Sequence, residues 1–202
     1  KIIYVGTLAG VVPGGPGHSH QSVRDISALA AMPGLVMLEP CCEVEVAETV
    51  SFCIETHKSS SYIRLVSIPC EVPFELPENY RLELGQGVTI ADGSDAVLFA
   101  YGPVMLANAW QARKKLDDEH GVSLKIVNMP WLNRVDHAWL ADTVADFRFV
   151  FTVDNHYLTG GQGEMLACAL GEIGALGDVR MARMGLSDIP QCGTNEEVLT
   201  AH

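Results

Sequence analysis

The sequence has few basic residues and no long uninterrupted apolar run. It contains 13 lysines and arginines against 25 aspartates and glutamates among 202 residues, which gives a formal net charge of −12. Affinity for phosphate backbones depends on clustered lysine and arginine, so this balance argues against nucleic-acid binding. It also disfavours attachment to anionic membrane surfaces. No apolar segment reaches the roughly 20 residues that a membrane-spanning helix needs. The sequence therefore predicts a soluble protein whose partners are neither nucleic acids nor membranes.

Several short motifs that mark enzymes and metal sites are also missing. No Gly-Lys-Ser/Thr follows the glycine-rich loop near the N-terminus, which excludes a Walker site, and neither G-x-S-x-G nor H-E-x-x-H occurs. No C-x-x-C pair exists, so zinc is a weak alternative. The cysteines have no framework spacing, and we expect reduced thiols in a cytoplasmic protein. The six cysteines are Cys41, Cys42, Cys53, Cys70, Cys168 and Cys192.

The composition is nevertheless that of a folded protein, with 48% hydrophobic and 19% charged residues. The length fits one large domain or two small ones. The first residues, from Lys1 to Val5, already form a strand-like pattern with no targeting segment before them. A capping box from Thr194 to Glu197 opens a helix that the sequence cuts short at His202. From its two ends, we expect the chain to be a piece of a longer polypeptide or a chain that needs a partner chain.

The first third of the chain alternates strand and helix patterns. The predicted elements are strands at 2–6, 35–38 and 62–66 and helices at 22–32 and 44–54. This order favours a parallel sheet with helical crossovers. The periodicity then fails over residues 69–87, which hold three prolines and two glycines, and we interpret this stretch as an interdomain linker.

A second unit follows the linker. Asp92-Gly93 separates two short apolar runs, which predicts a hairpin because Asp-Gly favours tight turns. A long amphipathic helix follows, with Pro103 near its first position. The predicted elements are strands at 88–90, 96–100, 123–127, 148–153 and 179–184 and helices at 103–116, 136–146 and 164–173. Together the two units predict an α/β protein of two three-layer units with parallel or mixed sheets.

Two loops between a strand and a helix are candidate sites, because open α/β sheets bind ligands beyond the carboxyl ends of their strands. In residues 14–21, glycines let a ligand approach the backbone, and His18 and His20 can act as acid/base groups. The alternative is a glycine–proline turn with surface histidines, and the spacing does not separate the two. In residues 154–163, Asp154-Asn155-His156-Tyr157 precedes a glycine-rich turn. Its simpler interpretation is a turn before a helix; the other is a polar cluster facing a cleft or a partner.

The first loop belongs to a longer run of motifs that continues along the whole chain. The motifs are Gly14-Gly15-Pro16-Gly17-His18-Ser19-His20-Gln21, Arg24-Asp25-Ile26, Met32-Pro33-Gly34-Leu35, Pro40 to Val46, Ser61 to Leu65, Val127-Asn128-Met129-Pro130, Val135-Asp136, Val153 to His156 and Gly160-Gly161-Gln162-Gly163. In this order they resemble the transketolase family, whose motifs include G-x-x-G-x-T-H, L-P-G and V-x-N-M.

The resemblance implies a domain organisation and a cofactor. It assigns residues 1–68 to the C-terminal half of a thiamine-diphosphate pyrimidine-binding domain, 69–87 to a linker and 88–202 to a transketolase C-terminal-like domain. The family binds thiamine diphosphate with Mg²⁺ or Ca²⁺ between the subunits of a dimer and passes a two-carbon unit from a ketose to an aldose. Its cofactor-activating glutamate and its diphosphate and metal motif have no counterpart here. The chain should therefore bind no cofactor tightly and be inactive without an N-terminal transketolase section, in the same chain or a separate one.

The resemblance also assigns individual residues. His20 matches the family histidine near the reacting centre and is the expected catalytic residue, with Ser19 in place of the family threonine. The residues expected beside the cofactor are Gly14, Gly17, Ser19 and Gln21. Asp154 and His156 match positions of the C-terminal domain for which we expect a structural or interfacial role.

Three departures from the family pattern restrict the class of substrate that the resemblance implies. Family positions that bind sugar hydroxyls and phosphate are occupied here by Leu8, Pro16 and Ser67. Losing an arginine at such a position removes bidentate phosphate recognition. The resemblance therefore implies a transferase of carbohydrate metabolism that moves a ketol or acyl unit from a substrate that need not be phosphorylated. The alternatives are the beta subunit of a 2-oxo-acid dehydrogenase and a non-catalytic assembly or regulatory module.

Overall fold

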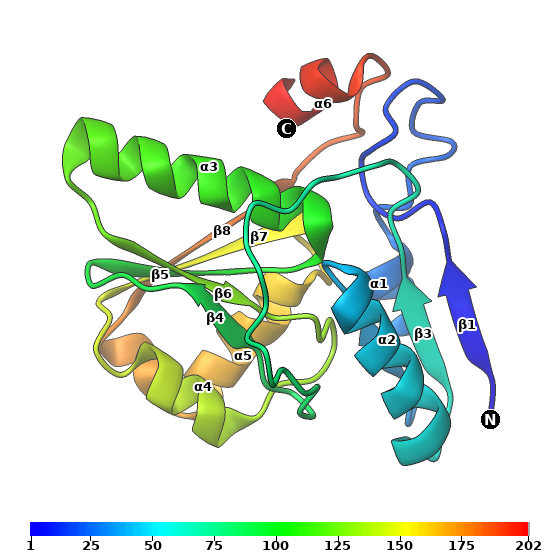
Figure 1. Cartoon of the computed structure of the whole chain (residues 1–202), viewed down its shortest axis with the longest axis horizontal. Helices are drawn as coiled ribbons and strands as arrows, with labels where there is room; N and C mark the ends of the chain where they lie inside the picture. The colour runs from blue at the N-terminus through cyan, green and yellow to red at the C-terminus, as the bar shows by residue number, and fades with distance from the viewer. Residues whose placement is uncertain (202) are drawn as a thin grey trace.

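Two β-sheets organise the protein, seen in a computed structural model that describes residues 1–201 (Figure 1). The first sheet has the order β1-β3-β2 and is entirely parallel. The second has the order β4-β6-β5-β7-β8, and only β4 runs antiparallel to its neighbour. The strands are β1 (Ile3–Gly6), β2 (Val36–Leu38), β3 (Ser61–Arg64), β4 (Val88–Ala91), β5 (Ala96–Ala100), β6 (Leu124–Asn128), β7 (Phe149–Tyr157) and β8 (Arg180–Leu186). The predicted α/β class with parallel and mixed sheets is confirmed.

The helices cover both faces of the larger sheet. Figure 1 shows α3 on one face and α4 with α5 on the other. The helices are α1 (Asp25–Leu29), α2 (Glu43–Ser51), α3 (Gly102–His120), α4 (His137–Val144), α5 (Gln162–Glu172) and α6 (Asn195–Ala201), with a π-helical extension of α2 at η1 (Phe52–Thr56) and a 3-10 turn at η2 (Ala175–Gly177). Residues 69–87 contain no helix or strand, as the failure of periodicity predicts.

Helices also cover both faces of the smaller sheet. Successive side chains of a strand point to opposite faces, so neighbouring residues show which helix lies on which face. Met37 of β2 packs with Ile26 of α1. Its neighbour Leu38 belongs to a different core cluster that includes Cys53, in the π-helical extension of α2. The two helices therefore lie on opposite faces of this sheet.

The two sheets share a hydrophobic core. The segment that follows β6 lies beside β2, where the Glu39 N–H donates to the Pro130 carbonyl over 2.9 Å and the Leu132 N–H to the Met37 carbonyl over 2.9 Å. Between these bonds Trp131 is fully buried, in one cluster with Phe99 of the larger sheet. Apolar surface buried across this junction holds the two sheets together.

The predicted hairpin around Asp92-Gly93 is wrong. β4 and β5 are not neighbours: β6 lies between them, antiparallel to β4 and parallel to β5. The connecting turn passes over the beginning of β6, and a Cβ on Gly93 would lie 2.2 Å from the Lys125 nitrogen. Every residue of β5 is buried, and the strand lies between β6 and β7 in the sheet.

The predicted end of the seventh strand is also wrong. The pattern places a loop at residues 154–157, but β7 continues through Tyr157, with a register irregularity between Val153 and Tyr157. Asp154, Asn155 and His156 are buried. The polar side chains of this stretch are typical of an exposed loop. In the structure they form hydrogen bonds inside the protein in place of hydrogen bonds to water.

All six cysteines are free thiols, as expected. Cys41 is buried and Cys42 is partly buried at the beginning of α2. Across residues 1–201, no helix combines the length and the apolar character needed to cross a membrane.

The capping box at α6 is confirmed and gives a first testable prediction. The Thr194 hydroxyl accepts from the Glu197 N–H over 3.2 Å, and the Glu197 carboxylate accepts from the Thr194 N–H over 2.8 Å. Thr194→Ala should lower the free energy of unfolding by about 1 kcal/mol, because an orphan helix N–H loses its acceptor. Urea denaturation measures the change. Thr200→Ala, at the other end of the same helix, is the matched control, and an equal loss in both variants would contradict a capping role.

Candidate functional site

The glycine-rich loop of residues 7–23 follows β1, and both its ends are fixed to neighbouring strands and to each other. The Ala9 N–H donates to the Leu65 carbonyl over 3.0 Å, just beyond β3, and the Gly10 N–H donates to the Ser22 carbonyl over 2.9 Å. The loop therefore stands at the carboxyl edge of a parallel sheet, where α/β proteins bind ligands. Its position agrees with the expectation from the sequence.

Ser19 and His20 lie together at the exposed part of this loop. The Ser19 Oγ is 2.9 Å from the His20 Nδ1, and both residues are exposed to solvent, as is His18. A hydroxyl and an imidazole side by side can donate and accept hydrogen bonds and exchange a proton with a bound molecule.

The expected cofactor-binding residues Gly14 and Gly17 are packed on the C-terminal segment of the chain. The Gly14 N–H donates to the Asn195 Oδ1 over 3.0 Å, and a Cβ on Gly14 would lie 2.5 Å from a methyl carbon of Val198 in α6. Gly17 has a φ of +74°, in the left-handed region that favours glycine. Both glycines thus determine the conformation of the loop where it packs on the C-terminal segment.

Gln21 follows His20 in sequence, but its side chain points into the protein. Its Nε2 donates to the Val11 carbonyl over 2.7 Å and to the Gln191 carbonyl over 3.3 Å, and the residue is buried. In this structure Gln21 holds the two arms of the loop to the C-terminal segment. Within the chain, this geometry gives Gln21 a positioning role, and a contact with a cofactor stays a prediction.

Asp154 organises the beginning of α5. Its Oδ1 accepts from the Gln162 N–H over 2.8 Å and from the Tyr101 hydroxyl over 3.0 Å, and its Oδ2 accepts from the Gly163 N–H over 2.9 Å. Burial raises the pKa of Asp154, although these donors oppose the shift. Its contacts are those of a helix-capping residue inside the chain.

His156 is buried where α1 meets β7. Its Nδ1 donates to the Tyr157 carbonyl over 2.7 Å, so its Nε2 is free to accept from the Ser27 N–H at 3.4 Å. Burial lowers the pKa of His156, which keeps the ring neutral as this arrangement requires. Neither Asp154 nor His156 lies with Ser19 and His20 on the exposed surface of the loop.

A buried ionic cluster beneath the loop was missed by the sequence analysis. The Arg64 guanidinium, at the end of β3, is fully buried and donates to the Asp25 Oδ2 over 2.8 Å and to the Glu39 carboxylate. It also donates to the carbonyls of Ser22 and Asn155 over 2.7 and 2.8 Å. The cluster thereby connects the loop, the smaller sheet and β7.

The pKa values of the two acids in this cluster shift in opposite directions. Burial raises the pKa of Glu39 to about 7, although Arg64 opposes the shift. For Asp25, burial acts in the same direction, but the charge and hydrogen bonds of Arg64 and the Tyr62 hydroxyl outweigh it and lower the pKa. The available signal in the sequence was a charged residue in or next to an apolar strand: Arg64 is the last residue of β3, and Glu39 directly follows β2.

Another buried carboxylate, Glu45, attaches the irregular segment 69–87 to α2 and to β6 of the larger sheet. Glu45 of α2 accepts from the Tyr80 hydroxyl over 2.5 Å, the Asn128 Nδ2 over 2.8 Å and the Cys41 N–H over 2.7 Å. These three donors satisfy both carboxylate oxygens. Burial raises the pKa of Glu45, and the hydrogen bonds oppose this shift. The linker is therefore fixed to the core rather than free.

Comparison with known proteins now places these features in a family. The family model "Transketolase, pyrimidine binding domain" matches residues 1–67, and "Transketolase, C-terminal domain" matches residues 85–202. The "Putative transketolase C-terminal section" of Methanocaldococcus jannaschii is 29% identical over 196 residues, which are 96% of this chain and 60% of the relative. The "Putative uncharacterized transketolase family protein y4mN" of Sinorhizobium fredii is 33% identical over 158 residues, which are 77% of this chain and 44% of the relative. The chain thus spans about half the length of these relatives.

The fold is shared with a solved structure described as "Split gene transketolase, inactive beta4 tetramer". The two superpose with a TM-score of 0.80 at 26% identity, over 98% of this chain and 60% of the other. Both family models, the curated relatives and the solved structure agree, and this chain belongs to the transketolase family.

Proposed function

We propose that this chain is the C-terminal section of a thiamine-diphosphate-dependent enzyme that transfers a two-carbon ketol or acyl unit, and that it becomes active only with an N-terminal section. The observation that carries the proposal is the exposed Ser19–His20 pair, on a loop whose ends are hydrogen-bonded at the carboxyl edge of the first sheet. Support for a divided enzyme comes from the similar split-gene transketolase, which is described as an inactive tetramer of one subunit type.

The residues of this chain fit one side of the expected cofactor. The Ser19 hydroxyl and the His20 imidazole can hold a polar ring or a substrate oxygen. Within residues 1–201, no group of three His, Cys, Asp or Glu side chains could hold the metal ion that accompanies the diphosphate. When bound, thiamine diphosphate supplies the nucleophilic carbon that attacks a carbonyl. In the proposal, His20 positions the reacting oxygen and holds a proton there, while the metal and diphosphate ligands come from the N-terminal section.

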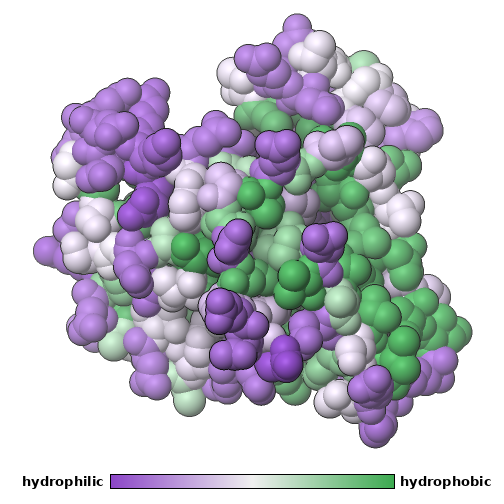
Figure 2. Space-filling model, viewed as in Figure 1, coloured by the Kyte–Doolittle hydropathy of each residue, from purple (hydrophilic) through white to green (hydrophobic). Residues whose placement is uncertain are grey.

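The free edge of the smaller sheet supports a partner section. Among the strands of residues 1–201, β1 pairs with β3 alone, and Ile2, Tyr4 and Val5 are each about half exposed. Figure 1 places β1 at the outer side of the molecule, and hydrophobic residues gather on that side in Figure 2. An exposed apolar edge strand readily pairs with another strand. In the proposal, the N-terminal section covers this edge.

The exposed positions around the loop favour a substrate without phosphate. Leu8, Pro16 and Ser67 occupy the positions at which the family resemblance expects substrate ligands, and all three are exposed. An apolar side chain, a proline and a hydroxyl cannot replace a guanidinium that grips phosphate with two parallel hydrogen bonds.

Reconstitution tests the proposal. Calorimetry with thiamine diphosphate and Mg²⁺ should show no binding to this chain alone and saturable binding to an equimolar mixture with a transketolase N-terminal section from the same organism. The mixture should also transfer a two-carbon unit from xylulose to an aldose more efficiently than from xylulose 5-phosphate, because the loop lacks a phosphate ligand.

A variant on the exposed edge provides the control. Val5→Lys should prevent assembly and cofactor binding, since it places a charge on the edge strand, whereas Ile189→Lys at another exposed apolar position should not. Tight cofactor binding by this chain alone would contradict the divided site. A mixture that binds the cofactor but transfers nothing would favour the assembly module, and efficient use of the phosphorylated pair would overturn the substrate assignment.

A further inference from the structure

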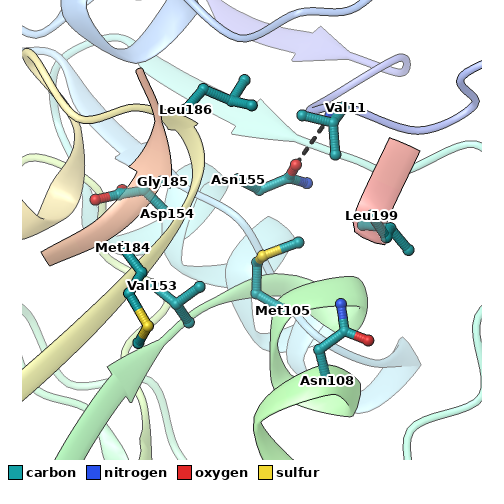
Figure 3. A pocket seen from close by; sticks show the side chains of 10 residues that line it. All are labelled: Val11, Met105, Asn108, Val153, Asp154, Asn155, Met184, Gly185, Leu186 and Leu199. Carbon is teal, nitrogen blue, oxygen red and sulfur yellow. Dashed lines mark hydrogen bonds between the residues drawn. The ribbon is translucent and has the colours of Figure 1, made fainter. Parts of the chain in front are cut away.

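A cavity of about 190 Å³ lies apart from the Ser19–His20 pair, between the loop, α3, β7, β8 and α6 (Figure 3). Its lining residues are Val11, Met105, Asn108, Val153, Asp154, Asn155, Met184, Gly185, Leu186 and Leu199. An apolar cavity of about 150 Å³ is sufficient to bind benzene in another protein. This cavity therefore has room for a small ring with a substituent.

The wall of the cavity is mostly apolar and partly adaptable. Val11, Met105 and Leu186 are buried and form its inner part, whereas Met184 is 43% exposed and Asn108 is exposed at its opening. Methionine side chains are flexible and polarizable, so they adjust to ligands of different shapes. An apolar pocket with few polar groups is the usual form of a small-molecule site.

One polar group in the wall has no partner. Asn155 is 1% exposed, and its Oδ1 accepts from the Val11 N–H over 2.9 Å. That bond fixes the orientation of the amide, so the remaining atom is the Nδ2 donor, which has no hydrogen-bond partner among the described residues. Figure 3 shows the nitrogen on the side away from the dashed bond, toward the space bounded by Leu199 and Met105. A buried donor without an acceptor is unfavourable, and a ligand oxygen would satisfy it.

The charges around the cavity select a neutral ligand. No lysine, arginine or histidine is among the residues that line it, so nothing there would compensate an anion. Both carboxylate oxygens of Asp154 already accept hydrogen bonds from the Tyr101 hydroxyl and from the first turn of α5, which leaves little for a cation. Burying an unpaired charge in such an apolar wall is strongly unfavourable.

From this geometry we infer that the cavity is a binding site for a small neutral molecule with an apolar ring or branched body and one carbonyl-type acceptor, which accepts a hydrogen bond from the Asn155 Nδ2. The site does not depend on the proposed two-carbon transfer, because none of its lining residues belongs to the Ser19–His20 pair. It lies against the loop that carries this pair, through Val11.

Methyl NMR of the full chain, labelled at the methionine methyl groups, tests the inference. Cyclohexanone should shift the Met105 and Met184 signals saturably and leave Met129, which is buried in the other core cluster, unchanged. Cyclohexane should bind at least about fivefold more weakly, since it cannot accept the Asn155 hydrogen bond, and cyclohexanecarboxylate should not bind. Equal shifts with all three probes, or none with cyclohexanone, would overturn the site.

Two variants identify the contacts. Asn155→Asp keeps the oxygen that accepts from Val11 and removes the Nδ2 donor, so it should weaken cyclohexanone binding by at least about fivefold. Met184→Trp fills the opening from a partly exposed position and should abolish binding even if the first variant does not fold. Leu176→Trp, at an exposed apolar position that does not line the cavity, is the matched control. Unchanged affinity in Met184→Trp would refute the location.

Discussion

Arg64→Met should lower the free energy of unfolding by about 3–5 kcal/mol, which is a large part of the stability of a typical domain. Arg64 is fully buried and makes ion pairs with Asp25 and Glu39 as well as hydrogen bonds to the carbonyls of Ser22 and Asn155. Methionine fills much of the volume of arginine but donates nothing. The Glu39 carboxylate and the Asn155 carbonyl therefore lose their donor, while Asp25 and the Ser22 carbonyl keep only the Tyr62 hydroxyl and the Gly10 N–H. Urea unfolding followed by circular dichroism measures the loss.

The pH dependence separates this electrostatic cause from a simple packing defect. Without Arg64, burial raises the pKa of both acids, so the folded state of the variant binds more protons than its unfolded state. Stability then falls as the pH rises, and the difference from the wild type should be larger at pH 8 than at pH 5. A packing defect would cost the same at both values.

Arg81→Met is the matched control for Arg64→Met. The Arg81 side chain is 72% exposed, approaches Glu48 at 3.5 Å and donates to the neighbouring Tyr80 carbonyl over 2.8 Å. Because these contacts are exposed to water, its replacement should change the free energy of unfolding by less than about 0.5 kcal/mol. If Arg64→Met behaved like this control, or if its effect did not depend on pH, the buried cluster would not hold the loop and the sheets together.

The difference between local and long-range information explains what could be predicted from the sequence. A β-branched run, helical apolar spacing and a capping box correctly predict elements close to β1, α3 and α6, because each signal reflects local geometry. The hairpin prediction fails because Asp92-Gly93 predicts a local turn and carries no information about β6, which comes later in the sequence and lies between β4 and β5.

The same distinction applies to the site. Residues 14–21 could be singled out because glycines and histidines stand together in sequence. The ionic cluster could not, because Arg64 takes its partners from positions 25 residues away, at Glu39, and 91 residues away, at Asn155. Glu45 likewise meets Asn128 only after the chain has folded, 83 residues further on. A buried charge is visible in sequence only as an unexpected residue in an apolar strand, without its partner.

His20→Ala should lower kcat/KM of the reconstituted enzyme by about 10²–10⁴-fold and leave the free energy of unfolding of this chain unchanged within about 0.5 kcal/mol. The imidazole is exposed, and its hydrogen-bond partner among the described residues is the exposed Ser19 hydroxyl, so its removal leaves no buried group unpaired. The kinetic and the stability result must be measured together, because a residue needed only for stability would change the free energy of unfolding of the chain. Steady-state kinetics with the N-terminal section and urea unfolding of the chain measure them separately.

His18→Ala tests whether the effect belongs to His20 or to any imidazole on the loop. His18 is exposed two residues earlier, and no hydrogen bond joins it to Ser19 in the described structure. Its replacement should change kcat/KM by less than about threefold, since a group outside the reacting centre does not contribute to acid–base catalysis. Ser19→Thr, which introduces the family's residue beside His20, should retain activity because its hydroxyl can still reach the His20 Nδ1. If His18→Ala reduced activity as much as His20→Ala, the loop would act through its overall charge or conformation, and the assignment of His20 to the reacting centre would be wrong.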